Sequence, residues 1–323
     1  MQYRTFGRAG WPVSAVGYGM WGLAGWTGGD DEETRGALDR AVALGCTFFD
    51  TAWGYGEGRS EQILGDLVRR HADKPLVVAT KVPPKNFIWP SRRGFTLDDC
   101  FPPDHIRAYA EKSLANLGTP RIDLLQFHVW EDAWAEDDRW QRAMDDLKRE
   151  GLVGATGISV NRWEPSNVMR SLATGQVDAV QVIYNIFDQA PQDELLPYCD
   201  QHQIAVIARV PFDEGTLTGT LTEGSTWPAE DWRSTYFVPE NLRASVEHAE
   251  ALRPLVPAGA SMAELALRWI LADRRVATVI PGMRKERNVE ANLAAADAPP
   301  LDPSLLAALK GHRWDRVPTA WSQ

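Results

Sequence analysis

CTFFDTAWGYGEGRSEQILGDLVRRH, residues 46–71, contains the pattern that decides the fold. Its first five residues form an apolar run of the kind found in buried strands, and residues 60–71 carry apolar side chains at helical spacing. A loop rich in glycine joins the two. The stretch therefore predicts a strand followed by a helix, with the carboxylate of Asp50 where the strand ends and the phenol of Tyr55 in the loop.

The same strand and helix unit recurs along the chain. Its apolar runs are mostly continuous, as expected of strands buried on both faces of a parallel sheet. The eight runs are 13–19, 46–50, 76–82, 123–128, 155–159, 179–185, 204–210 and 277–282, and the clearest helical segments are 31–45, 60–71, 104–118 and 261–273. Eight such units without a break in composition favour one α/β domain over residues 1–323, a single (β/α)8 TIM barrel, over an open sheet with a second domain.

Several segments lie outside this repeat. Residues 4–14, RTFGRAGWPVS, predict an N-terminal β-hairpin that closes the floor of the barrel. The intervals 83–103 and 211–238 are longer than a plain unit needs, and long loops after barrel strands usually shape an active site. Ser60, with a glutamate beside it, is expected to begin a helix, and Gly118 is expected to end one.

Composition excludes several classes of function. The formal net charge of −10 argues against non-specific binding of nucleic acid or of an anionic membrane. Cys46, Cys100 and Cys199 fit neither a metal site nor a disulfide framework, so buried thiols in a reducing cytoplasm are expected. The first residues lack the apolar core of a signal peptide, and no apolar run approaches the length of a membrane span. A cytoplasmic protein is expected.

Four ionisable residues are expected at one end of the barrel, because catalytic groups of such barrels lie at the carboxyl ends of the strands. The pattern places Asp50 and Tyr55 after the second strand, Lys81 in the third and His128 at the end of the fourth. Each has an ordinary alternative role, as a turn residue, a packed ring, a solvated strand end or a core histidine. Their coincidence on three neighbouring strands favours a shared site.

These four side chains suit a specific chemistry. A free phenol has a pKa near 10, and a neighbouring ammonium group lowers it, while a carboxylate holds that ammonium in place. Lys81 and Asp50 are therefore predicted to make Tyr55 a proton donor near neutral pH. His128 is placed to orient a carbonyl oxygen. Reduction of a carbonyl also needs a hydride, which no side chain supplies, so a nicotinamide cofactor is implied.

The chain resembles the aldo-keto reductase superfamily over essentially its whole length. The matching stretches are FFDTAWGYGEGRSEQILG, VATKV, IDLLQFH, TGISV, QVIYN, ARVPFDEGTLTG and VIPGMRKERNVEANL. In that family the corresponding residues form a catalytic tetrad, so the resemblance implies that Asp50, Tyr55, Lys81 and His128 (the tetrad below) carry it here. It also implies an NADP(H)-dependent carbonyl reductase, which in reverse oxidises an alcohol or a sugar.

The resemblance also implies a set of residues that bind the cofactor. Ser159 and Gln181 match positions that hold the nicotinamide carboxamide, and Arg209 stands where a residue, often aromatic, stacks on the ring. The full set is Met20, Ser159, Asn161, Gln181, Arg209, Val210, Pro211, Gly215, Leu217, Gly219, Gly282, Arg284, Asn288 and Asn292.

Two parts of this set decide how the cofactor would be held. The stretch 210–219 corresponds to the loop over the pyrophosphate. Arg284 is the candidate for a 2′-phosphate, because a planar guanidinium fork suits that anion. NADP(H) is therefore expected, with NAD(H) possible. Gly282 and Ala291 replace a lysine and a glutamate that occur at these positions in some members of the family.

Tryptophans cluster in the loops predicted to surround the site. They are Trp21, Trp26, Trp53, Trp89, Trp130 and, in the C-terminal tail, Trp321. Such residues suggest a pocket with aromatic walls, which suits an aromatic or aliphatic carbonyl or a sugar. The ordinary alternative is that some of them belong to the core.

Two other functions stay open. Barrels of this family also serve as regulatory or redox-sensing subunits of membrane channels, which bind the cofactor with little turnover. A metal-dependent hydrolase would need several histidines near strand ends, and the other five lie on predicted helices or at their ends: His71, His105, His202, His248 and His312. Residues 17–22 match the pattern G-x-G-x-x-G but do not open a helix, so they do not predict a dinucleotide-binding turn.

Overall fold

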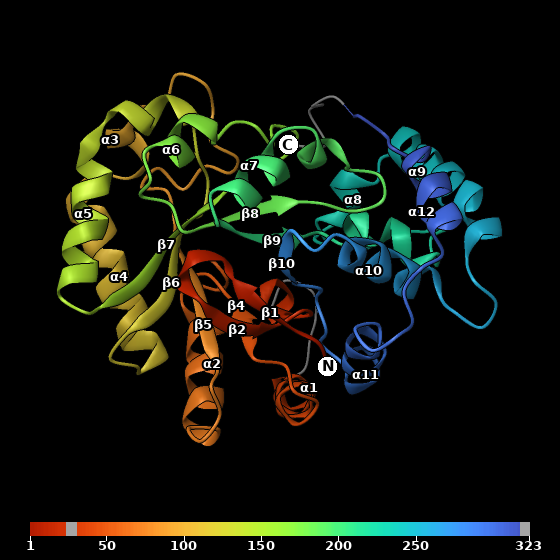
Figure 1. Ribbon diagram of the computed structural model, residues 1–323, viewed down its shortest axis with the longest axis horizontal. Helices are drawn as coiled ribbons and strands as arrows, with labels where there is room; N and C mark the ends of the chain where they lie inside the picture. Colours follow the sequence, from red (N-terminus) through yellow and green to blue (C-terminus); the bar gives the residue numbers. More distant parts are fainter. Residues whose placement is uncertain (24–30, 317–323) are drawn as a thin grey trace.

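Eight parallel strands form the centre of the molecule in the computed structural model, which describes residues 1–23 and 31–316 (Figure 1). They are β3 (Tyr18–Gly19), β4 (Phe48–Asp50), β5 (Val77–Val82), β6 (Ile122–Phe127), β7 (Val153–Ser159), β8 (Ala179–Ile183), β9 (Ala205–Arg209) and β10 (Val276–Val279). Neighbours in sequence are neighbours in the sheet. Two single bridges, Val16 to Val279 and Gly19 to Gly282, join the first strand to the last. The predicted barrel is confirmed.

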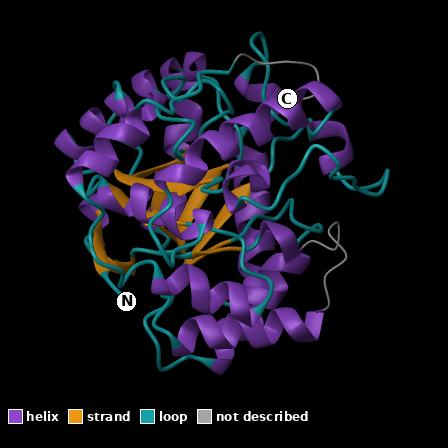
Figure 2. Ribbon diagram, turned by 90° about the vertical axis from the view of Figure 1, so that its right-hand side faces the viewer, coloured by secondary structure: helices purple, strands orange, loops and turns teal. Residues whose placement is uncertain are grey.

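Helices surround this barrel, with the strands gathered at the centre (Figure 2). They are α1 (Asp31–Ala43), α2 (Arg59–Arg70), α3 (Leu97–Cys100), α4 (Pro103–Leu117), α5 (Asp138–Arg149), α6 (Met169–Ala173), α7 (Leu195–Gln201), α8 (Arg233–Tyr236), α9 (Pro239–Leu252), α10 (Met262–Ala272), α11 (Glu286–Ala294) and α12 (Pro303–Lys310). Gly118 ends α4 in the left-handed conformation, as expected. Ser60 is not a cap: α2 begins at Arg59, and the Ser60 hydroxyl is bonded to Thr51.

The N-terminal hairpin, β1 (Tyr3–Phe6) and β2 (Trp11–Ser14), packs against the inside of the barrel. Phe6 and Val13 join a buried cluster with inward side chains of the strands, several of which are alanines. Small residues there leave room for the Phe6 ring, so the hairpin fills the floor as predicted. The run 13–19 is not one strand, however, because Ser14 pairs with Tyr3 whereas Tyr18 pairs with Phe49.

The last described residues return to the carboxyl ends of the strands. The Trp314 ring stacks on His248, with centroids 4.0 Å apart. Arg316 donates to Asp188 and to Asp213, each over 2.7 Å, and its side chain is only 7% exposed. These contacts hold the loops after β8 and β9 together beside the barrel mouth.

The cysteines and the apolar character of the helices were both predicted from the composition. The thiols of Cys46, Cys100 and Cys199 are free and buried, as predicted, and burial raises the pKa of Cys46 to about 12. Among residues 1–23 and 31–316, no helix combines the length and the apolar character that a membrane crossing requires.

Replacing Arg316 by Met is expected to destabilise the fold by about 3–5 kcal/mol, because Asp188 and Asp213 would stay buried without their cation. Arg313→Met is the matched control from the same segment: its partner Asp193 is 55% exposed, and pairs of this kind contribute about 0–1 kcal/mol. Urea unfolding of both variants measures the difference. Equal losses would show that the Arg316 pair does not hold the loops.

Candidate active site

The tetrad lies at the carboxyl end of three adjacent strands. Asp50 is the last residue of β4, Lys81 lies in β5 and His128 follows β6 directly. Tyr55 lies in the turn between β4 and α2, and its side chain is buried. The register pairs Asp50 with Ala79, and Lys81 lies two residues beyond Ala79 on the same face of β5. The parallel sheet therefore brings together side chains that are up to 78 residues apart in the sequence.

Lys81 is the centre of this arrangement. Its Nζ lies 2.5 Å from Asp50 Oδ1, 2.8 Å from the Thr51 carbonyl oxygen and 3.5 Å from the Tyr55 hydroxyl. Burial alone would lower the pKa of Lys81, but Asp50 and Tyr55 outweigh it and the pKa is raised. The side chain is therefore a fixed cation in contact with the phenol.

Two glutamines hold the second carboxylate oxygen of Asp50, the one that does not contact Lys81. Its Oδ2 accepts from Gln126 Nε2 over 2.9 Å and from Gln181 Nε2 over 2.8 Å. Gln126 was not among the residues predicted from the sequence. A signal existed, because Gln126 lies two residues before His128 in a predicted strand and must share its face. Gln181, expected to bind the cofactor, instead directs its amide nitrogen at Asp50 in this structure.

The predicted acidity of Tyr55 is wrong for this structure. Burial of the phenol raises its pKa, Lys81 opposes that effect, and Asp50 adds to it. The net pKa lies above the ordinary value, so the hydroxyl keeps its proton at neutral pH. Lys81 thus limits the cost of losing the proton without producing a phenolate in advance.

His128 completes the site as a neutral ring. Its centroid lies 5.6 Å from that of Tyr55, with the rings nearly perpendicular. Burial, Lys81 and Arg209 hold the pKa of His128 well below its usual range. Its Nδ1 is buried without a hydrogen-bond partner among the described residues. A neutral imidazole at this place can donate one N–H to a substrate oxygen.

The next strands bring together the residues expected around a nicotinamide ring. Ser159 ends β7, Gln181 lies in β8 and Arg209 ends β9, so they follow one another around the mouth. Arg209 donates to the Val160 carbonyl oxygen over 2.9 Å. The prediction that Asn161 binds the cofactor needs correction. Its amide nitrogen instead donates to the Ser91 hydroxyl, to Glu131 and to the Trp130 carbonyl oxygen.

Residues 210–219 form a tightly turned loop that follows Arg209. Asp213 and Glu214 have positive φ angles of 46° and 57°, and Gly215 follows with 115°. Leu217 is fully buried, and Pro211 is also buried. Ion pairs hold the strained turn: Arg162 contacts Glu214 over 2.5 Å, and Arg316 contacts Asp213.

The end of β10 offers the donors expected for a phosphate. A Cβ on Gly282 would meet no atom within 4 Å, so the space above it is open. The half-buried Arg284 lies against Gly22, where a Cβ would come within 3.1 Å of its Cδ. Asn288 is exposed and Asn292 is buried on the helix that follows, α11. A guanidinium beside an open glycine and a helix N-terminus fits a bound phosphate.

Only some of the tryptophans predicted to form an aromatic wall lie at the mouth of the barrel. Trp89 is 41% exposed and its ring lies 5.7 Å from His128, and Trp53 packs against Tyr109 nearby. Trp21 is exposed, in contact with Trp232. Trp130 is a correction: it is fully buried in the core and donates to the Ser171 hydroxyl. Trp26 and Trp321 lie outside the described residues.

One aromatic residue at the mouth was not predicted from the sequence. Phe87, 49% exposed, lies with its ring 6.1 Å from Trp89 and 6.2 Å from Trp53. Its position in the long interval after β5 was the available signal.

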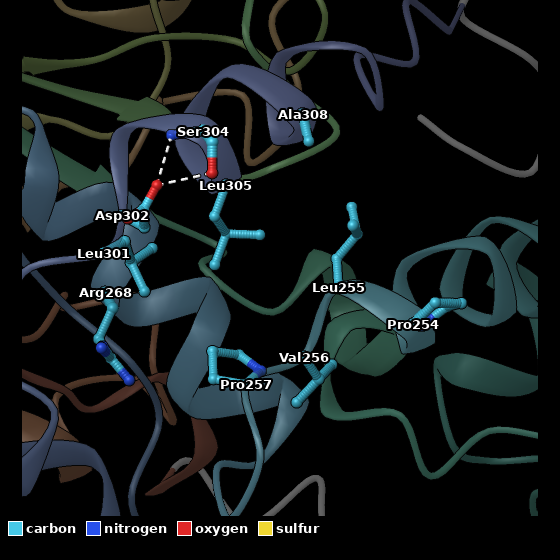
Figure 3. A pocket seen from close by; sticks show the side chains of 10 residues that line it. All are labelled: Pro254, Leu255, Val256, Pro257, Arg268, Leu301, Asp302, Ser304, Leu305 and Ala308. Carbon is cyan, nitrogen blue, oxygen red and sulfur yellow. Dashed lines mark hydrogen bonds between the residues drawn. The ribbon is translucent and has the colours of Figure 1, made fainter.

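Two other hollows lie on the surface, and no residue of the tetrad lines either of them. A groove of about 530 Å³ lies between α12 and the turn after α9, with Leu255, Val256, Leu301 and Leu305 in its wall (Figure 3). A smaller cavity of about 170 Å³ is lined by Arg316 and Asp188, among other residues. Among the residues that the structure describes, no group of histidine, cysteine and carboxylate side chains could hold a metal ion.

Comparisons with known proteins agree with this geometry. An uncharacterized oxidoreductase of Bacillus subtilis (strain 168) is 30% identical over 322 residues, 97% of this chain and 96% of that protein. The NADH-specific methylglyoxal reductase of Escherichia coli (strain K12) is 28% identical over 299 residues, 88% and 90% of the two chains. The holo form of an aldo-keto reductase from Bacillus halodurans has a TM-score of 0.78 at 26% identity, covering 100% of both chains. The model of the aldo/keto reductase family matches residues 15–313, and this chain belongs to that family.

Proposed function

We propose that this protein is an NADP(H)-dependent carbonyl reductase in which Tyr55 gives a proton to the substrate oxygen. The observation that carries the proposal is the contact of the Tyr55 hydroxyl with Lys81 Nζ, 3.5 Å away, beside the buried His128 ring. A protonated phenol, a fixed cation and a neutral imidazole at one mouth suit the polarisation and protonation of a carbonyl.

The cofactor, when bound, supplies a hydride to the carbonyl carbon. His128 orients the carbonyl by donating an N–H to its oxygen. As negative charge grows on that oxygen, Tyr55 transfers its proton there, and the Lys81 ammonium stabilises the phenolate that remains. The phenolate then regains a proton from solvent. Asp50 takes no part in the transfer and positions Lys81.

The proposed cofactor is inferred from the residues at the carboxyl ends of β7 to β10. Ser159 and Arg209 are proposed to contact the nicotinamide, and the loop 210–219 to cover the pyrophosphate. The half-buried Arg284 supports a 2′-phosphate and hence NADP(H), although the relative from Escherichia coli is specific for NADH. Assays with both cofactors decide between the two.

The substrate is proposed to be a small carbonyl compound held by aromatic rings. Trp53, Phe87 and Trp89 form one side of the mouth beside His128, with centroids of adjacent rings about 6 Å apart. An aromatic aldehyde or the CH face of a sugar would stack on such a wall. The reverse reaction, oxidation of an alcohol, uses the same groups.

Tyr55→Phe is expected to lower kcat for reduction of nitrobenzaldehyde by roughly 10²–10⁴-fold, the usual contribution of a general acid. The ring stays in place, so binding of NADPH, followed by tryptophan fluorescence, is expected to be unchanged. Full turnover in this variant would refute the mechanism. Binding of NADPH by a wild type that reduces no carbonyl would instead favour a sensor.

The wild-type kcat for reduction is expected to stay level with rising pH and to fall only above about pH 10, because burial raises the pKa of Tyr55 above its ordinary value and the protonated phenol is the active form. His128 adds no break above about pH 6.5, because its pKa is lowered. A pH series of kcat, with circular dichroism as the control for unfolding, measures this. A fall centred near pH 7 would show that Lys81 outweighs burial.

A further inference from the structure

We infer that Arg209 places a positive charge, with no carboxylate in contact, beside the nicotinamide ring, so that the protein binds the reduced cofactor more tightly than the oxidised one. This inference rests on the proposed function. It concerns which redox state of the cofactor the protein prefers to bind, which the tetrad does not decide.

The position of Arg209 makes its charge part of the catalytic pocket. It is the last residue of β9, and its guanidinium donates across the mouth to the carbonyl oxygen of Val160, which follows β7. Burial raises the pKa of Tyr55 and the charge of Arg209 opposes that effect, whereas burial lowers the pKa of His128 and the same charge adds to it. A ring that delivers hydride to a carbonyl held by those two residues must therefore lie within range of the same charge.

Arg209 differs from the other buried cations at this end of the barrel. Each of the others has a carboxylate in contact: Lys81 is paired with Asp50, Arg162 with Glu214, and Arg316 with two aspartates. Within the described part of the chain, no carboxylate lies within salt-bridge distance of Arg209, and its Nε is buried without a partner. The charges of Arg162 and Glu214 both act on Arg209 and oppose each other.

The charge balance of the pocket follows from these contacts. The ammonium of Lys81 and the carboxylate of Asp50 cancel, and the neutral His128 and the protonated Tyr55 add nothing. Among these five side chains, Arg209 is left as the excess positive charge. Burial and the neighbouring Arg162 lower the pKa of Arg209 to about 10, which still leaves it charged at neutral pH.

The two states of a nicotinamide ring respond differently to such a charge. The reduced ring is neutral, whereas the oxidised ring carries a positive charge. Two like charges a few ångströms apart at a partly buried site repel each other enough to change an equilibrium by about tenfold or more. Arg209 therefore weakens binding of the oxidised form selectively. A stacking residue without charge would contact both forms alike.

Titration of the protein with NADPH and with NADP⁺ separately, followed by quenching of tryptophan fluorescence and without any carbonyl, tests the inference. The wild type is expected to bind NADPH about tenfold more tightly than NADP⁺ or better. Arg209→Met keeps an unbranched side chain of similar length and removes the charge, so the ratio of the two dissociation constants is expected to fall towards one. Arg209→Lys keeps the charge and is expected to preserve most of the ratio.

Several results would overturn the inference. Equal affinity of the wild type for the two forms would do so without any variant. A ratio in Arg209→Met equal to that of the wild type, with both affinities weakened in parallel, would show that Arg209 acts by stacking alone. Thermal melting of each variant checks that it is folded, and Arg209→Gln is a second neutral variant. Failure of the wild type to bind either form would refute the proposed function itself, which distinguishes the two failures.

Discussion

The buried ion pair of Lys81 and Asp50 is the interaction on which the rest of the site depends. Two charges removed from water are favourable only when their geometry is good and their remaining donors and acceptors are satisfied. Both conditions are met: Lys81 also donates to the Thr51 carbonyl, and Asp50 also accepts from Gln126 and Gln181. The pair thereby links the ends of β4, β5, β6 and β8 and fixes the ammonium against Tyr55.

Burial and the neighbouring charges determine the protonation state of Tyr55 and of His128. The phenol stays protonated because burial outweighs the ammonium, and the imidazole stays neutral because burial and two cations act in the same direction. A proton donor and a neutral hydrogen-bond donor are what reduction of a carbonyl requires. The guanidinium of Arg209 lies where β9 ends and donates to the carbonyl oxygen of Val160, and within the described residues no carboxylate is in salt-bridge contact with it.

Much of this could be predicted from the sequence, because periodicity and strand order fix what a parallel barrel must bring together. The tetrad follows from residues at the ends of consecutive strands. Trp130 could not be assigned, since a loop tryptophan beside a catalytic residue can point outward or into the core, and only packing against its neighbours decides. Asn161 failed for a similar reason, because Ser91 and Glu131 arrive from distant segments to bind its amide. The acidity of Tyr55 depended on how completely the fold excludes water, which no motif records.

We expect Asp50 to act on catalysis only through Lys81. A double-mutant cycle of Asp50→Asn and Lys81→Met, measured as kcat/KM for reduction of one aldehyde, tests it most directly. If the two residues work as one unit, the double variant loses little more activity than the worse single variant. If the losses of the single variants multiply in the double variant, the residues act independently and the ion pair is not the basis of the site.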